Sequence, residues 1–225
     1  MKIGIIVAVV REFKSFLQDS FDFTTETISN REVCKFNVNN NEVFITQSGA
    51  GIIDASSATQ FLITKYDCEI ILNYGVTGCL TKGISVGNLF IVDKVCHYEL
   101  DTSPIDPILK YQYIEFKDQY IPMDSELIRI SKTIEPDLIN VICASGSKFI
   151  VNKDEKIKLH QETKASICDM EIAGIARTCF KNNVRCLSIK CISDDFDGDG
   201  NDFEKNIVSS GEKAFKVLKK ILFAL

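Results

Sequence analysis

The stretch KIGIIVAVV at residues 2–10, followed directly by REFKSFL at residues 11–17, decides how the chain is expected to fold. The first segment is rich in β-branched residues and carries no charge after Lys2, which predicts a buried strand. In the second segment the apolar residues recur at helical spacing. A buried strand that leads straight into a helix is the opening unit of an α/β fold.

Strands and helices continue to alternate along the rest of the chain. Three short β-rich segments separated by polar turns predict antiparallel hairpins at 21–28, 33–38 and 42–46. Helices are then expected at 52–66, 125–134, 154–162, 172–181 and 203–225, and further strands at 69–74, 87–97, 140–144, 166–169 and 184–192. This order predicts one α/β domain over residues 1–225. We expect a three-layer sandwich with a mixed, mostly parallel central sheet, partly barrel-like if the strand at 87–97 closes it.

Residues 101–123 interrupt this alternation. They hold most of the prolines and no clear apolar period, so a long ordered loop or a lid is expected there. Tyr111, Tyr113, Ile114 and Phe116 make the loop too apolar to lie bare. A second copy of the chain is therefore expected to cover it in a homodimer.

Composition argues against several classes of function. The formal net charge is −5 and the lysines are dispersed apart from a group at 213–220, which speaks against a nucleic-acid partner. The apolar runs are too short to cross a membrane and no signal-peptide pattern is present, so a cytoplasmic location is expected. The nine cysteines include no CxxC pair and no histidine at ligand spacing, which predicts reduced thiols used as small apolar residues and no metal site.

Three carboxylates stand at the ends of expected strands, where ligands bind in α/β sheets. Glu12 follows the first strand, Glu171 opens a helix after Asp169 and Met170, and Asp194 follows the strand at 184–192. The three acids could converge on one pocket. Alternatively, each is a helix N-terminal acid that the helix dipole favours.

Two glycine-containing turns also follow strands, at 48–51 (SGAG) and 75–78 (GVTG). Small residues there would let backbone N–H groups approach a bound anion or sugar, although either turn could simply be tight. A third pattern, Asp195-x-Asp197-x-Asp199-Gly200, matches the start of an EF-hand calcium loop. The match fails at the twelfth position, which is Asn206 instead of glutamate, so a polar loop before the last helix is the preferred interpretation.

Taken together and in order, these segments resemble the successive signatures of the methylthioadenosine/S-adenosylhomocysteine nucleosidases, in the nucleoside phosphorylase superfamily. The resemblance runs from Met1 almost to the C-terminus. The segments that carry it are 1–8 with Glu12, then 48–51, 73–80 (NYGVTGCL), 87–92 (GNLFIV), 145–150 (SGSKFI), 169–176 (DMEIAGIA) and 192–194 (ISD).

The resemblance implies a homodimeric hydrolase without a cofactor that cleaves the N-glycosidic bond of 5′-substituted adenosines and releases adenine. Methylthioadenosine, S-adenosylhomocysteine and 5′-deoxyadenosine are the expected substrates, and methionine salvage is the expected context. Asp194 would be the general acid for the leaving adenine and Glu12 the base that activates water. The other matching positions would bind substrate: Glu171 at the ribose hydroxyls, Met170 on the sugar, Phe149 stacked on the base, the Ile150 backbone at its edge, and Val76, Thr77, Gly78, Ser193 and Lys190 around them.

The chain departs from the family pattern at several positions. Lys190 stands where the family usually has arginine, which keeps the charge but loses the planar fork. Ser147 replaces an aspartate, Cys79 a glycine and Val76 a small or hydroxyl residue, and residues 10–11 replace two acids. Two alternatives therefore stay open: a phosphate-dependent purine nucleoside phosphorylase, and a catalytically weak nucleoside-binding homologue.

Overall fold

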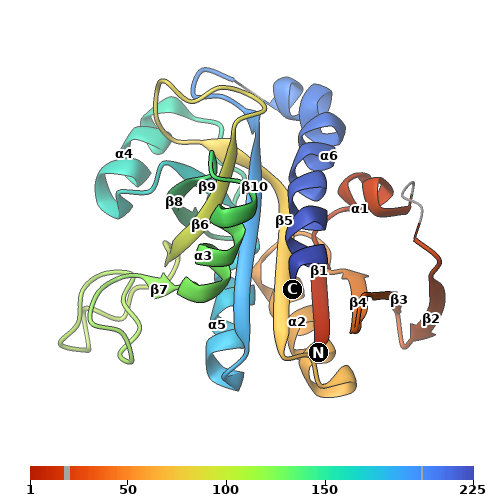
Figure 1. Cartoon of the computed structure of the whole chain (residues 1–225). Coiled ribbons are helices and arrows are strands. Elements are labelled where there is room, and N and C mark those ends of the chain that lie inside the picture. The colour runs from red at the N-terminus through yellow and green to blue at the C-terminus, as the bar shows by residue number, and fades with distance from the viewer. Residues whose placement is uncertain (18–20, 199) are drawn as a thin grey trace.

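The computed structural model describes residues 1–17, 21–198 and 200–225, built around one large sheet (Figure 1). The strands are β1 (Lys2–Val7), β2 (Thr24–Ile28), β3 (Arg31–Val38), β4 (Asn41–Gln47), β5 (Ile70–Cys79), β6 (Leu89–His97), β7 (Ile121–Pro122), β8 (Ile139–Ser145), β9 (Ile167–Asp169) and β10 (Arg185–Asp194). The helices are α1 (Val10–Leu17), α2 (Ile52–Tyr66), α3 (Ser125–Ile134), α4 (Lys153–Thr163), α5 (Ile172–Asn182) and α6 (Gly200–Ala224).

The sheet is mixed and closes on itself at one end. Its order is β10-β6-β8-β9-β5-β1-β4-β3-β2, and an additional ladder joins β10 to β5, so that five strands form a barrel. Parallel ladders join β1 to β4 and β5, β5 to β10, and β8 to β6 and β9. The N-terminal strands pair as the expected antiparallel hairpins. The expected mixed, partly barrel-like α/β sheet is thus confirmed.

Two groups of helices cover the sheet. Helix α6 packs on β10 and β5 and against α1, whereas α2 and α5 pack on each other, with α2 also contacting β1 and β4. Strands β5 and β10 are consequently buried along almost their whole length, which explains their near-continuous apolar sequences. Because β1 and β10 run parallel to β5, their carboxyl ends lie at the same edge of the sheet, and the short β9, antiparallel to β5, pairs with the end of β5 there.

Most element boundaries agree with the expectations from sequence, but β5 and β10 run further. β5 continues through the glycines to Cys79, and β10 includes Asp194 as its last residue. Residues 101–120 form turns and irregular backbone, as expected for a long ordered loop. Its aromatic residues are largely covered within the chain: Tyr111 is buried, and Tyr113 and Phe116 pack against the core. These three rings therefore need no second subunit to cover them, whereas Ile114 of the same loop stays exposed.

The acidic pattern after β10 does not build an EF-hand loop. Asp199 lies outside the described residues, but α6 begins at Gly200, so the later positions of the calcium pattern are helical. Asn206, at the twelfth position, donates hydrogen bonds to the carbonyl oxygens of Ser193 (3.0 Å) and Asp202 (2.8 Å). It fastens the start of α6 to the end of β10.

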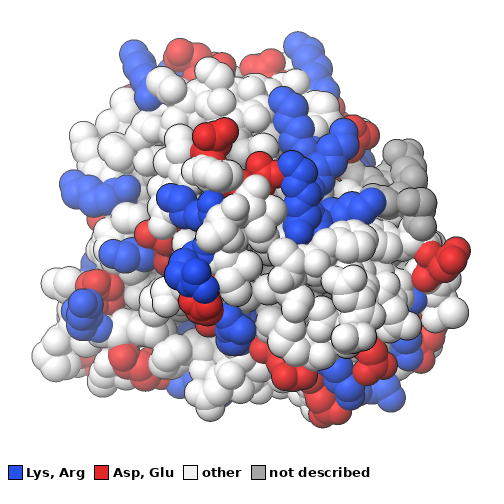
Figure 2. Space-filling view, viewed as in Figure 1, with Lys and Arg blue, Asp and Glu red and all other residues white. Residues whose placement is uncertain are grey.

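Charges of both signs are interspersed over much of the face in Figure 2, with one group of basic side chains over α6. Within the described ranges, no helix is long and apolar enough to cross a membrane. All nine cysteines are unpaired and buried.

Candidate active site

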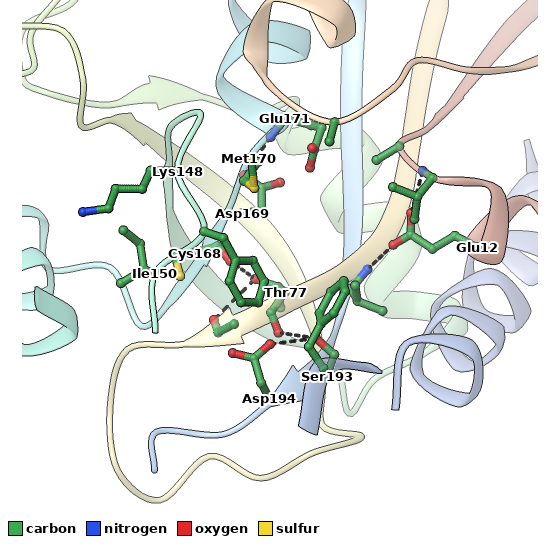
Figure 3. Close-up of a pocket in the computed structure, with 17 residues that line it drawn as sticks. Glu12, Thr77, Lys148, Ile150, Cys168, Asp169, Met170, Glu171, Ser193 and Asp194 are labelled. Atoms are coloured by element: carbon green, nitrogen blue, oxygen red, sulfur yellow. Dashed lines mark hydrogen bonds between the residues drawn. The ribbon is translucent and has the colours of Figure 1, made fainter. Parts of the chain in front are cut away.

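One pocket opens at the carboxyl ends of the strands and collects residues from seven parts of the chain (Figure 3). Its walls include all three carboxylates singled out from sequence: Glu12 from α1, Glu171 at the start of α5, and Asp194 at the end of β10. The other predicted residues that line it are Val76, Thr77, Gly78, Phe149, Ile150, Met170 and Ser193. The structure thus brings together ten of the eleven predicted site residues.

Glu12 is held as an acceptor of backbone N–H groups. Its side chain is buried, and its two oxygens accept hydrogen bonds from the N–H of Val76 (2.7 Å) and of Val9 (3.3 Å). Burial raises the pKa of Glu12 above its ordinary value, although the Val76 N–H and the Lys190 ammonium act in the opposite direction. The contact with Val9 is the capping role expected of a first-turn acid, but the contact with Val76 ties Glu12 to β5 and to the pocket.

Asp194 has a different environment. Its Oδ1 accepts a hydrogen bond from the Ser193 hydroxyl (2.9 Å), and its Oδ2 lies 4.0 Å from the ammonium of Lys156. Burial raises the pKa of Asp194, whereas Ser193 and Lys156 lower it. A raised pKa shifts a carboxyl toward the protonated form that a general acid needs.

Glu171 points away from its own helix. Although it occupies the residue before α5, its side chain makes no capping hydrogen bond there, and its Oε1 instead accepts from the N–H of Gly51 (2.9 Å). Burial, and then the neighbouring Asp169 carboxylate, raise the pKa of Glu171 to about 7. A favourable interaction with the dipole of α5 therefore does not by itself explain this residue, because its carboxylate binds the Gly51 N–H and the residue lines the pocket.

Gly75 and Gly78, which lie within β5 and not in the expected turn, make room for carboxylates of the chain itself. A Cβ atom at Gly75 would lie 2.8 Å from Glu12 Oε1, and one at Gly78 would lie 3.0 Å from Asp194 Oδ2. The sequence suggested that small residues here admit an anion, and the anions that approach are the carboxylates of Glu12 and Asp194. Each glycine therefore serves one of the two candidate acid–base residues.

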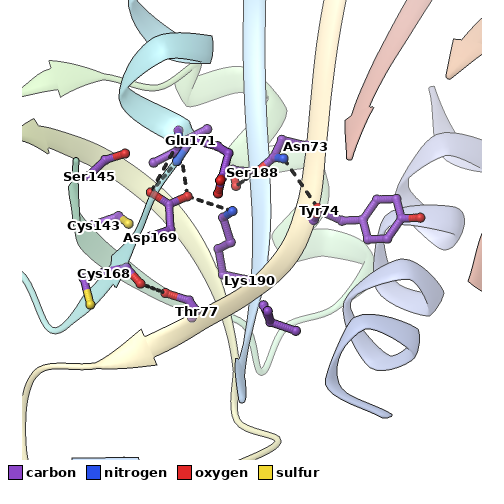
Figure 4. Close-up of polar contacts among 12 residues, drawn as sticks. Asn73, Tyr74, Thr77, Cys143, Ser145, Cys168, Asp169, Glu171, Ser188 and Lys190 are labelled. Atoms are coloured by element: carbon purple, nitrogen blue, oxygen red, sulfur yellow. Dashed lines mark hydrogen bonds and ion pairs between the residues drawn. The ribbon is translucent and has the colours of Figure 1, made fainter. Parts of the chain in front are cut away.

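Lys190 is the predicted residue that the pocket lining, as far as the chain is described, does not include. Its side chain is 2% exposed, and its ammonium lies 2.8 Å from Asp169 Oδ2 behind the pocket wall (Figure 4). Burial alone would lower the pKa of Lys190, but the carboxylates of Asp169 and Glu171 raise it. The prediction that Lys190 contacts substrate is corrected accordingly: it is the counter-charge for a buried acid.

Asp169 is the residue of this region that sequence reasoning passed over. Its carboxylate lines the pocket, accepts hydrogen bonds from the N–H groups of Glu171 (3.4 Å) and Ile172 (3.2 Å), and pairs with Lys190. It therefore fixes the turn that presents Met170 and Glu171. Its place directly before Met170 was the available signal.

Further pocket residues were also missed. Phe203 comes from the first turns of α6 and meets Phe149 edge to face, with ring centroids 5.1 Å apart. Cys168, Lys148, Ala8, Val9 and Ala50 also line the pocket. Lone apolar or small residues carry no chemical signature in a sequence, so the fold was needed to find them.

Two departures from the family pattern have local structural roles. Ser147 Oγ accepts from the N–H of Ile52 (3.3 Å) at the start of α2, and Cys79 Sγ donates to the carbonyl oxygen of Thr81 (2.7 Å). Across the described part of the chain, no group of three or more His, Cys, Asp or Glu side chains is arranged to hold a metal ion.

Comparison with known proteins identifies the family of the chain. The phosphorylase superfamily model matches residues 2–222. The 5′-methylthioadenosine/S-adenosylhomocysteine nucleosidase of Shewanella loihica is 28% identical over 232 residues and covers 99% of each chain. The enzyme of the same name from Buchnera aphidicola is 28% identical over 227 residues, covering 99% of this chain and 97% of the relative.

Solved structures give the same picture. A futalosine hydrolase mutant of Helicobacter pylori superimposes with a TM-score of 0.93 at 26% identity, covering 100% of both chains. A mutant of the H. pylori methylthioadenosine/S-adenosylhomocysteine nucleosidase, with 5′-methylthioadenosine in its active site, has a TM-score of 0.91 at 26% identity and covers 100% of this chain and 99% of that one. The chain therefore belongs to the phosphorylase superfamily, and the nucleosidases, which are N-glycosidic hydrolases, are members that it resembles over its full length.

Proposed function

We propose that this protein hydrolyses the N-glycosidic bond of 5′-substituted adenosines and releases adenine. The observation that carries the proposal is the meeting of Glu12, Glu171 and Asp194 in one pocket, each buried and each on a different element. Cleavage of this bond builds positive charge on the ribose ring and negative charge on the leaving base. Carboxylates beside the ring and a protonated acid beside the base are what such a reaction requires.

Asp194 is proposed as the general acid. As the bond between the ribose and the base breaks, its electron pair goes to the purine, and the proton of Asp194 goes to a purine nitrogen. The raised pKa of Asp194, caused first by burial, supports a protonated starting state. The Ser193 hydroxyl, 2.9 Å from Oδ1, orients the carboxyl.

Glu12 is proposed as the base that takes a proton from the attacking water, whose oxygen bonds to the ribose carbon. Burial raises the pKa of Glu12, but two backbone N–H groups and the charge of Lys190 act in the opposite direction and favour the deprotonated form that a base needs. Glu171 is proposed to accept hydrogen bonds from the ribose hydroxyls. Met170 would pack on the sugar, Phe149 would stack on the base and the Ile150 backbone would meet the edge of the base, with Val76, Thr77 and Gly78 completing the wall.

A phosphorylase has less support. Phosphate needs a cationic site, and the pocket residues that the structure describes include one cation, Lys148, which is paired with Glu155 at 2.6 Å. The carboxyl groups that line the same space would repel phosphate wherever they are ionised. A binding protein without turnover is disfavoured by the presence of both acid–base candidates in one pocket.

The decisive experiment measures release of the free base from methylthioadenosine, S-adenosylhomocysteine, 5′-deoxyadenosine, futalosine and inosine, with and without phosphate. We expect phosphate-independent release of adenine from the first three. The futalosine arm is included because a futalosine hydrolase structure is as similar as the nucleosidase structures. Dependence on phosphate would establish a phosphorylase, and tight adenine binding without turnover would establish a binding protein.

We also propose a cytoplasmic homodimer. Ile53 (82% exposed), Ile105 (84%) and Ile114 (73%) present apolar side chains to the surface of the single chain. A partner that covers such residues stabilises the assembly by removing them from water. Light scattering at micromolar concentration should give twice the mass of the 25.2 kDa chain, and a monomer would contradict the proposal.

A further inference from the structure

Lys156 is a charged residue on the buried face of α4. It shares that face with Leu159 and Thr163, and its side chain is 0% exposed. Removing an ammonium group from water is costly unless acceptors surround its protons. The partners of Lys156 therefore indicate its role.

Those partners belong to the turn that follows Asp194. The Lys156 ammonium donates to the carbonyl oxygens of Asp195 (2.9 Å) and Phe196 (3.3 Å), and that of Gly198 lies at 3.5 Å. The same ammonium lies 4.0 Å from Asp194 Oδ2. One buried group thus fastens the backbone after the candidate acid and faces its carboxyl.

We propose that Lys156 is a positioning residue for the general acid: it fixes the turn after Asp194 and supplies the counter-charge for the carboxylate that remains when Asp194 has given up its proton. The inference rests on the proposed function for the identity of the acid. Lys156 does not line the pocket as the described residues define it, so it acts through Asp194 and not on substrate.

The other groups around Asp194 in the described residues are negative or neutral, so they cannot supply a counter-charge. Asp195 in the turn and Asp202 in α6 are negative, and the thiols of Cys79 in β5 and Cys168 in β9 lie nearby. Ser193 contributes a neutral hydroxyl. Among these groups of the described residues Lys156 is the cation, and its positive charge offsets the negative charges of Asp195 and Asp202 when Asp194 loses its proton.

The test compares two lysines of the same helix that contact the same turn. Lys156→Met removes the charge and the donors, whereas Lys156→Gln removes the charge but keeps an amide that can donate to the turn. Lys153→Met is the matched control, because Lys153 pairs with Asp197 at 2.7 Å on the exposed side of the turn. Thermal unfolding of each variant establishes that it is folded.

Two readouts are measured. The first is the ¹³C NMR titration of the Asp194 carboxyl, whose signal is identified by its loss in Asp194→Asn. Since an opposite charge within about 4–6 Å shifts a carboxyl by roughly one to three pH units, the midpoint should rise by about one pH unit or more in both Lys156 variants and stay in place in Lys153→Met. The second is the pH profile of adenine release, whose falling limb should move to higher pH, with kcat reduced roughly tenfold and KM nearly unchanged.

An unchanged Asp194 midpoint in Lys156→Met or Lys156→Gln would overturn the proposal, as would an equal shift in Lys153→Met. A wild-type chain that releases no base would remove the proposed function, yet the NMR titration would still test whether Lys156 acts on Asp194. Active Lys156 variants with the wild-type pH profile would leave the proposed function intact and refute the role of Lys156.

Discussion

The two ends of the pocket hold their acids by different means. At one end, backbone N–H groups from Val76 and Gly51 bind Glu12 and Glu171, and the Lys190–Asp169 ion pair lies behind them. At the other end, Asp194 accepts from a hydroxyl, and its cation, Lys156, stands further away at 4.0 Å. Burial raises the pKa of the acids at both ends, and what differs is the group that opposes this shift: backbone N–H groups and Lys190 at the first end, and the Ser193 hydroxyl and Lys156 at the second.

The largest expected effect comes from removing the proton at the second end. Asp194→Asn keeps the shape and a hydrogen bond but cannot protonate the base, so kcat should fall by roughly a hundred- to ten-thousand-fold with little change in KM. Steady-state kinetics of adenine release measure this loss. Asp195→Asn and Asp197→Asn should change little, and equal damage from Asp195→Asn would mean that the acid is wrongly assigned.

The next effect is expected at the first end, in stability. Lys190→Met leaves Asp169 buried without its counter-charge, and breaking a buried pair in this way costs about 3–5 kcal/mol. Chemical denaturation should show that loss, and the double variant Lys190→Met/Asp169→Asn should recover part of it. Because Lys190 also lowers the pKa of Glu12, the rising limb of the activity profile should move to higher pH. A stable Lys190→Met variant would show that the pair contributes little.

Gly75 and Gly78 of β5 allow the two ends of the pocket to be disturbed separately. Gly75→Ala should push Glu12 aside and Gly78→Ala should push Asp194 aside, because the added methyl groups would lie 2.8 Å and 3.0 Å from their carboxylate oxygens. We expect each to lower kcat by roughly tenfold to a hundredfold, since small displacements of catalytic groups have effects of that size. Gly83→Ala, where nothing lies within 4 Å of the added atom, is a control for the loss of a glycine, although its positive φ of 88° adds some strain. Near-native activity of Gly75→Ala would contradict the close approach.

The sequence predicted the three acids of the pocket better than it predicted the buried lysines that act on them, for a physical reason. Glu12, Glu171 and Asp194 follow strands, so local order along the chain was enough to bring them to one edge. Helices α2 and α3 begin and end at the residues expected from the sequence, and in α3 the Asp124 side chain accepts a hydrogen bond from the Leu127 N–H, which is a local interaction. The buried pairs Lys190–Asp169 and Lys156–Asp194 join distant elements, and no local pattern distinguishes a buried lysine from a solvated one.

Strand β5 is a second case in which local sequence did not predict the structure. Its sequence NYGVTGC contains glycines that normally end a strand, which is why the strand was expected to stop at residue 74. In the structure β5 continues to pair with β10, from Gly75 opposite Lys190 to Gly78 opposite Asp194, with a shift of register between Ile192 and Asp194. Pairing with β10 overrides the tendency of glycine to end a strand. It does so at the two positions where a Cβ atom would lie 2.8 Å or 3.0 Å from a carboxylate oxygen of a candidate catalytic residue.

The smallest expected effect is a gain in stability at the first end. The pKa of Glu171 is raised by burial to about 7, whereas in the unfolded chain it has its ordinary value of 4.5. The folded state therefore binds this proton more tightly than the unfolded chain does, so its contribution to stability is fully present below about pH 4.5 and is lost as pH rises through 7.

The variant Glu171→Gln tests this prediction, because its side chain cannot ionise and its amide oxygen can still accept a hydrogen bond from the Gly51 N–H. At pH 8 the variant should be more stable than wild type by about 1–3 kcal/mol, with the difference vanishing near pH 4.5. Denaturant unfolding at the two pH values measures this, with the exposed Glu42→Gln on β4 as a control that should change neither curve. Activity should fall in Glu171→Gln if the carboxylate binds the ribose hydroxyls. A variant less stable than wild type at pH 8 would mean that the Gly51 hydrogen bond and the nearby Lys190 charge outweigh the cost of burying the carboxylate.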